Sequence, residues 1–322
     1  MRVAVIDDFL KVALNYGDWN AVKAKAELSI FTDHLADADA VVARLKDFEV
    51  ICAMRERTPF PRAILERLPK LKLLVTSGKV NRSIDLQAAT DLGIVVCGTD
   101  SGGNSTCELA WGLILAVARN IPANDADVRQ GGWQIGVGMG LQGKTLGILG
   151  LGKIGGSAAK VGLAFGMKVI AWSQNLTEER CREVGVEKAA SKEDLLKRAD
   201  VVTIHMVLGD RSRGLIGAKE FAVMKPTAIL VNTSRGPIVV QDDLLAALKA
   251  GKIGGAGIDV HDVEPLPTDH PMRSAPRTVL TPHLGYVSDD GYAFYYGQSA
   301  DAVVAYLNGA PIRVMNPDVL KI

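Results

Sequence analysis

Short apolar runs alternate with amphipathic stretches along the first third of the chain. The runs read as strands and the stretches between them, such as residues 61–68 and 85–92, read as helices. Strand–helix alternation predicts a parallel sheet with helices on its faces. The predicted strands are Val3–Ile6, Leu28–Phe31, Val50–Cys52, Leu71–Val75 and Gly93–Cys97.

A second region repeats this pattern more clearly. It opens with an apolar stretch, Ser105–Pro122, that predicts one long helix, capped by Asn104 or Ser105 and ended by Pro122. Residues 144–172 then read as a strand, a glycine turn, a helix and a second strand. Further strands are predicted at Val201–His205, Ala228–Asn232, Gly255–Val260 and Thr278–Thr281.

The two regions predict a nested domain organisation. A final helix is expected at Asp290–Leu307, followed by a tail without a pattern of its own that should pack back on the first domain. The expected fold class is α/β, with two Rossmann-like, doubly wound parallel-sheet domains and a cleft between them. A dinucleotide-binding domain of residues 102–287 is inserted into a substrate domain built from 1–101 and 288–322. Two crossings between domains would form a hinge, which suits a small substrate.

Composition excludes several other classes of function. The net charge of +1 disfavours nucleic acid or an anionic membrane as the main partner. The four cysteines are scattered without a CxxC pair, which is typical of reduced thiols in a cytoplasmic protein. No apolar run reaches the roughly 20 residues that a membrane span needs, and the acidic start does not resemble a signal peptide.

The turn after the strand at 146–149 carries a GxGxxG motif, Gly150, Gly152 and Gly155. In such a motif the first glycine permits the tight turn, the second lets the backbone approach a pyrophosphate, and the third lets helix and strand pack closely. The helix that follows would offer free amides to the phosphates. The alternative is a glycine-rich connection without a ligand, but the flanking strand and helix favour a dinucleotide.

The end of the next strand bears on the choice of cofactor. An NAD site usually has an acid about 20 residues beyond the motif, but this chain has Ser173, Gln174 and Asn175 there. Their side chains could hydrogen-bond a ribose or a phosphate, so NAD(H) and NADP(H) both stay open. No arginine stands at this position to hold a 2′-phosphate, the nearest being Arg180, and this favours NAD.

Three polar stretches follow apolar strands later in the chain, and they carry Arg235, Asp259 with Glu264, and His283. Ligands of open parallel sheets bind outside the carboxyl ends of the strands, so these side chains are expected to converge. An arginine binds a carboxylate, a histidine moves a proton near neutral pH, and a glutamate beside it favours the imidazolium. Together with a dinucleotide they suit the reduction of a 2-keto acid. The spacing of the other histidines matches no metal-ligand signature.

Four stretches in this order, "GILGLGKIG", "MKPTAILVNTSRGPIV", "GIDVHDVEPLP" and "LTPHLGY", resemble the D-isomer-specific 2-hydroxyacid dehydrogenase family. The resemblance implies that Arg235 binds and polarises the keto acid, that His283 is the acid/base and that Glu264 is its partner. It implies that Asp259 faces the nicotinamide carboxamide and that Thr106 touches the cofactor phosphate. The turn Ser77, Gly78 and Lys79 would bind the substrate carboxylate. The full predicted cofactor site is Thr106, Gly150, Gly152, Lys153, Ile154, Gly155, Ser173, Gln174, Asn175, Thr233, Asp259 and Gly285.

Within the family the chain resembles a glycerate-dehydrogenase or hydroxypyruvate-reductase-like branch, which implies glyoxylate or hydroxypyruvate as substrate. It departs from the family's pattern at Lys79 and Arg82, where small residues are common near the substrate turn, and at Tyr286. The alternative function is a dinucleotide-sensing binding protein without turnover. The resemblance also implies a homodimer, and the apolar helix predicted from Ser105 is consistent with a symmetric interface.

Overall fold

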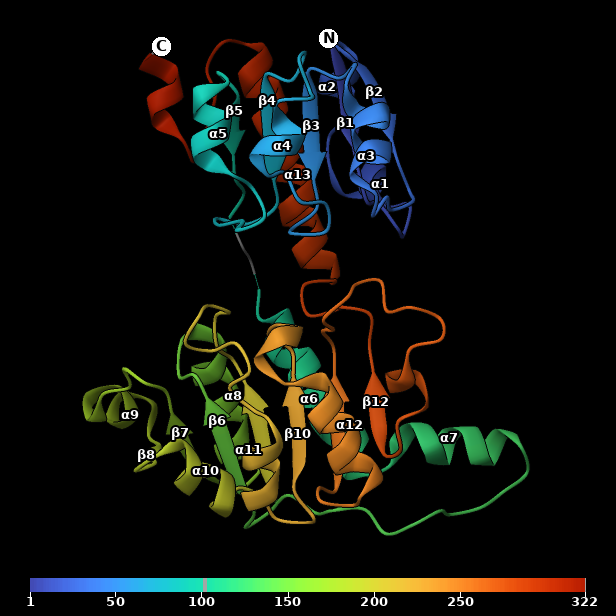
Figure 1. Ribbon diagram of the computed structural model, residues 1–322, viewed down its shortest axis with the longest axis vertical. Helices are drawn as coiled ribbons and strands as arrows, with labels where there is room; N and C mark the ends of the chain where they lie inside the picture. The colour runs from blue at the N-terminus through green and yellow to red at the C-terminus, as the bar shows by residue number, and fades with distance from the viewer. Residues whose placement is uncertain (101–102, 322) are drawn as a thin grey trace. The chain divides into compact units, whose positions relative to one another are not determined.

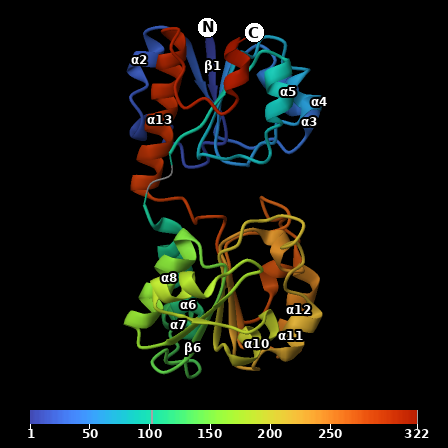
Figure 2. The same ribbon diagram turned by 90° about the vertical axis from the view of Figure 1, so that its left-hand side faces the viewer.

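The computed structural model describes residues 1–100 and 103–321, and the chain divides into two compact units. The first unit is Met1–Gly103 with Ser288–Ile322, and the second is Asn104–Val287 (Figure 1). The boundary that the sequence predicts between residues 101 and 102 lies outside the described residues. In each unit helices cover both faces of a parallel sheet (Figure 2), which is the predicted two-sheet α/β architecture.

The first unit contains a five-stranded parallel sheet in the order β2-β1-β3-β4-β5. Strands β3 and β4 are buried along their whole length because helices cover both faces, so they read as continuous apolar runs. The strands are β1 Arg2–Val5, β2 Glu27–Ile30, β3 Val50–Ala53, β4 Leu73–Thr76 and β5 Val95–Cys97. The helices are α1 Ala13–Tyr16, α2 Asn20–Lys23, α3 Ala38–Leu45, α4 Arg62–Leu65, α5 Leu86–Asp91, α13 Asp289–Leu307 and the 3-10 helix η3 Pro317–Lys321.

The tail after α13 packs on this unit, as the sequence predicts. Val314 forms an antiparallel bridge with Cys97 of β5. The side chain of Asn316 accepts a hydrogen bond from the Val96 amide and donates one to the Ile94 carbonyl. These bonds satisfy the outer edge of β5, which would otherwise present unpaired backbone groups.

The second unit contains a seven-stranded parallel sheet in the order β12-β11-β10-β9-β6-β7-β8. The chain winds outward from β6 to β7 and β8, then returns to β9 on the other side of β6, so the strand order reverses between β6 and β9. The strands are β6 Thr145–Leu149, β7 Lys168–Trp172, β8 Glu187–Lys188, β9 Val201–Ile204, β10 Ile229–Asn232, β11 Gly255–Ile258 and β12 Thr278–Leu280. The helices are α6 Ser105–Ala118, α7 Ile121–Arg129, α8 Lys153–Ala164, α9 Glu178–Val184, α10 Lys192–Arg198, α11 Ala218–Val223, α12 Gln241–Lys249 and the 3-10 helices η1 Gly236–Ile238 and η2 Pro271–Ser274.

The prediction of a single helix from Ser105 to Pro122 was wrong. Helix α6 ends at Ala118, Asn120 adopts a left-handed conformation, and Pro122 lies in the first turn of the next helix, α7. Proline is favoured at the start of a helix because its missing amide has no partner there in any case. Pro122 therefore marks a beginning and not an end.

The apolar surface of α6 is used inside the second unit. Trp111 is 5% exposed and stacks on Phe165 at 5.0 Å, and Ile114 is fully buried. Helix α6 packs against β10, β11 and α8, so its apolar character does not argue for a symmetric interface as the sequence suggested. The homodimer stays a prediction that rests on the family resemblance.

Two general expectations concern the environment of the chain. Among residues 1–100 and 103–321, no helix is both long and apolar enough to cross a membrane. All four cysteines are buried and none forms a disulfide, consistent with small core side chains.

Candidate active site

The glycine motif lies between β6 and α8, at the point where the strand order reverses and where open sheets bind ligands. Gly150 has φ +96°, and a Cβ there would come within 2.6 Å of the His205 carbonyl oxygen of the neighbouring strand. A Cβ at Gly155 would overlap the Gly150 carbonyl. Both positions therefore require glycine for the turn itself.

Gly152 differs from the other two glycines. A Cβ at this position would meet no atom of the protein within 4 Å. Gly152 precedes the first residue of α8, whose cap has no side-chain hydrogen bond, so the amides of the first helical turn point toward open space. Lys153 and Ile154 are exposed beside it. An open, amide-lined helix start fits the pyrophosphate of a dinucleotide.

Arg180 of α9 lies near this turn, and the sequence did not predict this position. Its Nε donates to the Leu151 carbonyl at 3.1 Å, so the guanidinium lies beside the glycine motif. Its Nη1 also donates to Glu183 at 2.9 Å. Arg180 and Leu151 are 29 residues apart in the sequence. Only the folding of the chain between them brings them together.

The polar residues predicted to receive the adenosine ribose lie just beyond β7. Ser173 is half-buried, and Gln174 and Asn175 are exposed. The Gln174 amide donates to the Arg211 carbonyl at 3.0 Å, so its carbonyl oxygen is left for a ribose hydroxyl. The structure thus places all three residues at the same sheet edge as the glycine turn.

Arg235 lies in the loop after β10, held by bonds from both sides. The Asn232 side chain donates to the Arg235 carbonyl at 2.9 Å, and the Ser234 hydroxyl donates to the Ile204 carbonyl at 2.7 Å. A Cβ on the next residue, Gly236, would overlap the backbone of His261. The loop that carries Arg235 therefore contacts the loop that carries Glu264, and Gly236 is needed for that close approach.

Glu264 and His283 meet directly. The distance from His283 Nδ1 to Glu264 Oε2 is 2.6 Å, and the other carboxylate oxygen accepts from the His261 amide at 2.8 Å. Burial opposes ionisation of Glu264, but the hydrogen bond and charge of His283 outweigh it, so the pKa of this carboxyl is lowered. The His283 ring also packs edge-on against Tyr286. With Nδ1 occupied, Nε2 is the nitrogen left for a substrate.

Asp259 holds the loop of His283 in place through hydrogen bonds. Its fully buried carboxylate accepts from the Thr281 hydroxyl at 2.6 Å, the Leu284 amide at 2.7 Å and the Gly285 amide at 3.0 Å. Burial raises the pKa of Asp259, and these hydrogen bonds oppose the rise. The contacts hold His283 at φ +56°, a left-handed conformation that is uncommon outside glycine. This geometry supports a positioning role for Asp259, and its expected contact with the nicotinamide stays a prediction.

Thr106 and Gly285, both predicted cofactor residues, bond to each other. The Thr106 hydroxyl donates to the Gly285 carbonyl at 2.6 Å, which ties the start of α6 to the His283 loop. Since its proton is used in this bond, the hydroxyl is left only as an acceptor. A bond from Thr106 to a phosphate oxygen would require this contact to break.

Three buried polar atoms at the same sheet edge have no hydrogen-bond partner among the described residues. They are Thr233 Oγ1, after β10, His205 Nδ1, after β9, and His261 Nδ1, after β11. Burial lowers the pKa of His205 to about 4, so its ring is neutral near pH 7. Unsatisfied buried groups are costly and call for an explanation. A dinucleotide lying across the ends of β6, β9 and β10 fits Thr233 and His205.

The predicted substrate turn belongs to the first unit. The Ser77 hydroxyl accepts from the Arg55 amide at 2.8 Å, and the Gly78 amide donates to Thr99 Oγ1 at 2.7 Å. Lys79 forms an ion pair with Asp100 at 2.9 Å. Ser77 and Gly78 are thus bonded inside their own unit.

Comparison with known proteins agrees with this geometry. Residues 111–285 match the family model of the D-isomer specific 2-hydroxyacid dehydrogenase NAD binding domain. A glyoxylate reductase from Aeropyrum pernix is 38% identical over 80% of each chain, and one from Thermococcus litoralis is 35% identical over 99% of this chain and 94% of its own. A solved D-3-phosphoglycerate dehydrogenase-type oxidoreductase from Ralstonia solanacearum is 36% identical, with a TM-score of 0.93 over 99% of this chain and 98% of its own.

The fold and the glycine turn define a nicotinamide-dinucleotide-dependent oxidoreductase of the Rossmann type. The chain belongs to the D-isomer-specific 2-hydroxyacid dehydrogenase family. Enzymes of this family act on small 2-keto or 2-hydroxy acids with NAD(P).

Proposed function

We propose that the protein reduces glyoxylate or hydroxypyruvate reversibly to the corresponding 2-hydroxy acid, with NADH as the preferred cofactor. The observation that carries this proposal is the 2.6 Å contact between Glu264 and His283, at the same sheet edge as the glycine turn. The similarity to two glyoxylate reductases supports the choice of substrate.

Each side chain has a distinct role in this mechanism. When bound, the reduced cofactor supplies a hydride to the keto carbon. His283, protonated, donates a proton from Nε2 to the substrate oxygen, while Glu264 on Nδ1 fixes the ring and favours its charged form. Arg235 holds the carboxylate and polarises the carbonyl oxygen with its planar fork of donors.

The preference for NADH rests on the end of β7. Ser173 and Asn175 provide neutral donors and acceptors for a ribose, whereas a 2′-phosphate needs a cation. Of two arginines near this edge, Arg180 donates to the Leu151 carbonyl and to Glu183, and Arg211 contacts Gln174 through its backbone carbonyl. The preference for NADH therefore rests on the neutral side chains of Ser173, Gln174 and Asn175, which suit ribose hydroxyls.

The experiment is to follow absorbance at 340 nm with NADH and NADPH, each crossed with glyoxylate, hydroxypyruvate, pyruvate and 2-ketoisocaproate. Faster oxidation of NADH is expected with glyoxylate and hydroxypyruvate than with pyruvate or 2-ketoisocaproate. Activity confined to 2-ketoisocaproate or to NADPH would contradict the proposal. Tight NADH binding by calorimetry with no oxidation in any well would favour the dinucleotide-sensing alternative.

A further inference from the structure

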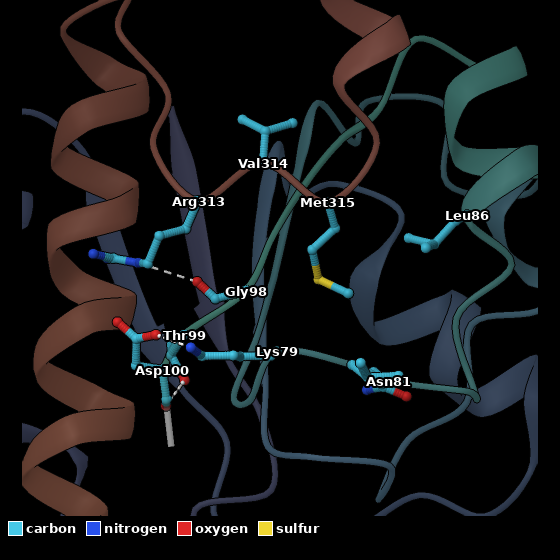
Figure 3. A pocket seen from close by; sticks show the side chains of 10 residues that line it. Lys79, Asn81, Leu86, Gly98, Thr99, Asp100, Arg313, Val314 and Met315 are labelled. Atoms are coloured by element: carbon cyan, nitrogen blue, oxygen red, sulfur yellow. Dashed lines mark hydrogen bonds and ion pairs between the residues drawn. The ribbon is translucent and has the colours of Figure 1, made fainter. Parts of the chain in front are cut away.

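The first unit contains a pocket of about 460 Å³, a size that suits a small organic molecule. Its walls come from the loop after β4, the loop after β5, the start of α5 and the tail after α13 (Figure 3). One side is apolar, with Val80, Leu86, Val314 and Met315. The polar lining residues are Lys79, Asn81, Thr99, Asp100 and Arg313.

Two of these polar residues are fully occupied by the fold. The Asn81 amide donates to the Arg55 carbonyl and the Thr76 hydroxyl, and its oxygen accepts from Ser83. The Thr99 hydroxyl accepts from the Gly78 amide and donates to the Asp100 carbonyl. Asn81 and Thr99 therefore build the pocket and leave recognition of a ligand to the three charged residues.

The two cations keep donors available. Lys79 Nζ has one partner, Asp100, at 2.9 Å, and an ammonium carries three protons. Arg313 donates Nε to the Gly98 carbonyl and Nη2 to the Gln298 carbonyl, which uses two of its five N–H groups. Among the described residues, no carboxylate forms an ion pair with Arg313 within 4.0 Å. The three charged side chains together carry a net charge of +1.

The loops that carry the cations are bonded to each other. Gly98 and Arg313 are bonded through both backbone and side chain, because the Gly98 amide also donates to the Arg313 carbonyl at 3.0 Å. The Thr99 amide donates to the Gly78 carbonyl at 3.2 Å, which locks the two loops to each other. Figure 3 shows the Lys79 and Arg313 side chains extending toward the same end of the pocket, where Asp100 lies. Lys79, with a smaller contribution from Arg313, lowers the pKa of Asp100, so both cations act on this carboxylate.

We propose that this pocket binds the anionic group of a small organic acid, a carboxylate or a phosphate, through Lys79 and Arg313. In the free protein Asp100 occupies one donor of Lys79 and competes with the incoming anion. The apolar wall of Val314 and Met315 would contact the carbon skeleton of the ligand. Glyoxylate and hydroxypyruvate carry one carboxylate and no second anionic group, so the anion bound here belongs to a separate effector.

The test is calorimetric titration of inorganic phosphate into the enzyme saturated with NADH, so that the phosphate-binding turn of the second unit is already filled. Lys79→Met should weaken phosphate binding about tenfold, since an ionic hydrogen bond is lost. Asp100→Asn should strengthen it, because the internal competitor loses its charge while the shape of the side chain is kept. Opposite signs from two neighbouring residues are not expected from general loss of structure.

Lys70→Met is the matched control. Lys70 also forms an exposed ion pair, with Asp47 at 2.6 Å, but it lies outside the pocket. It should leave phosphate affinity unchanged. The proposal is overturned if the wild-type enzyme binds no phosphate at millimolar concentration, or if Lys79→Met and Asp100→Asn behave like Lys70→Met. Melting temperatures of all variants show that each is folded.

A second measurement distinguishes an effector from the substrate's own carboxylate. Phosphate that competes with the keto acid in steady-state reduction, and does so less in Lys79→Met, would place Lys79 at the substrate carboxylate and overturn the effector assignment. Phosphate that binds by calorimetry without changing the KM for the keto acid assigns it to an effector. This kinetic arm rests on the proposed function, but the calorimetric result does not. A missing reductase activity therefore leaves the pocket fully testable.

Discussion

The carboxyl edges of the two parallel sheets carry similar polar residues but treat them differently. In the first unit, Asn81 and Thr99 are 3% and 1% exposed, and their side chains are bonded to neighbouring loops. In the second unit, Thr233 is 5% exposed, and its hydroxyl has no partner among the described residues. The buried polar side chains compared at the first edge have their hydrogen-bond partners within the protein, whereas the one at the second edge lacks a partner among the described residues.

The same kind of α/β fold occurs in both units, and this difference indicates which sheet edge leaves buried polar groups open to a ligand. Buried polar groups that are satisfied stabilise the folded state, and those left unsatisfied cost stability unless a ligand completes them. The open space at Gly152 and the unpaired Thr233 hydroxyl belong to the second kind. At the pocket of the first unit, the charged residues Lys79 and Arg313 keep donors to spare.

The largest effect is expected at Arg235. Replacing it with alanine should lower kcat/KM for the keto acid about 100- to 1,000-fold, because the donor that acts on the developing negative charge is lost. NADH affinity, measured by fluorescence titration, should stay the same. Arg235→Lys keeps the charge but loses the planar fork, so its activity should fall between the two. Wild-type turnover by the alanine variant would remove Arg235 from the mechanism.

Gly152→Ala should act on the cofactor alone. The new methyl group meets no protein atom, so the melting temperature should hardly change, yet it fills space that the pyrophosphate needs. We expect NADH affinity to fall about 10- to 100-fold, from a steric cost of roughly 1–3 kcal/mol. Gly140→Ala, also in open space but outside the motif, is the control. Equal NADH affinity in both variants would show that the dinucleotide does not approach Gly152.

Glu264→Gln should shift the pH dependence of reduction. The lowered pKa of Glu264 keeps its charge beside the imidazolium at neutral pH, and this charge favours the protonated ring. Without it the proton is lost more easily, so reductive activity should disappear at a lower pH than in the wild type. Profiles of kcat/KM against pH for both proteins measure the shift. A profile that does not move would separate Glu264 from the acid/base step.

Much of the fold could be predicted from the sequence because buried parallel strands have an unmistakable composition. The run predicted at Val201–His205 is β9, Val201–Ile204, and the run predicted at Ala228–Asn232 is β10, Ile229–Asn232. The short strand β8, Glu187–Lys188, was missed since two charged residues give no apolar signal. Pro122 was misread because a proline favours the start of a helix as strongly as it disfavours its interior.

The site was harder to predict in its details. The glycine turn and the Glu264–His283 pair follow from short motifs, whose residue types carry their chemistry. The contact of Arg180 with Leu151 and the bonds of Asp259 to three residues of the His283 loop depend on tertiary packing. No local pattern reports such contacts. The sequence therefore indicated the residues that we propose to be reactive, but not the contacts that hold them in place.

The smallest expected effects test the comparison of the two edges most directly, through two buried threonines. Thr99→Val removes a hydroxyl with two partners and should cost about 1–3 kcal/mol of unfolding free energy, since the Gly78 amide then loses its acceptor. Thr233→Val removes a hydroxyl without a described partner, so stability should be unchanged or slightly higher, while NADH affinity should fall severalfold if the cofactor bonds to it. Thermal melts with and without NADH measure both effects. Equal destabilisation of the two variants without NADH would mean that the Thr233 hydroxyl already has a hydrogen-bond partner in the free protein. Thr233 would then no longer be evidence for a bound dinucleotide.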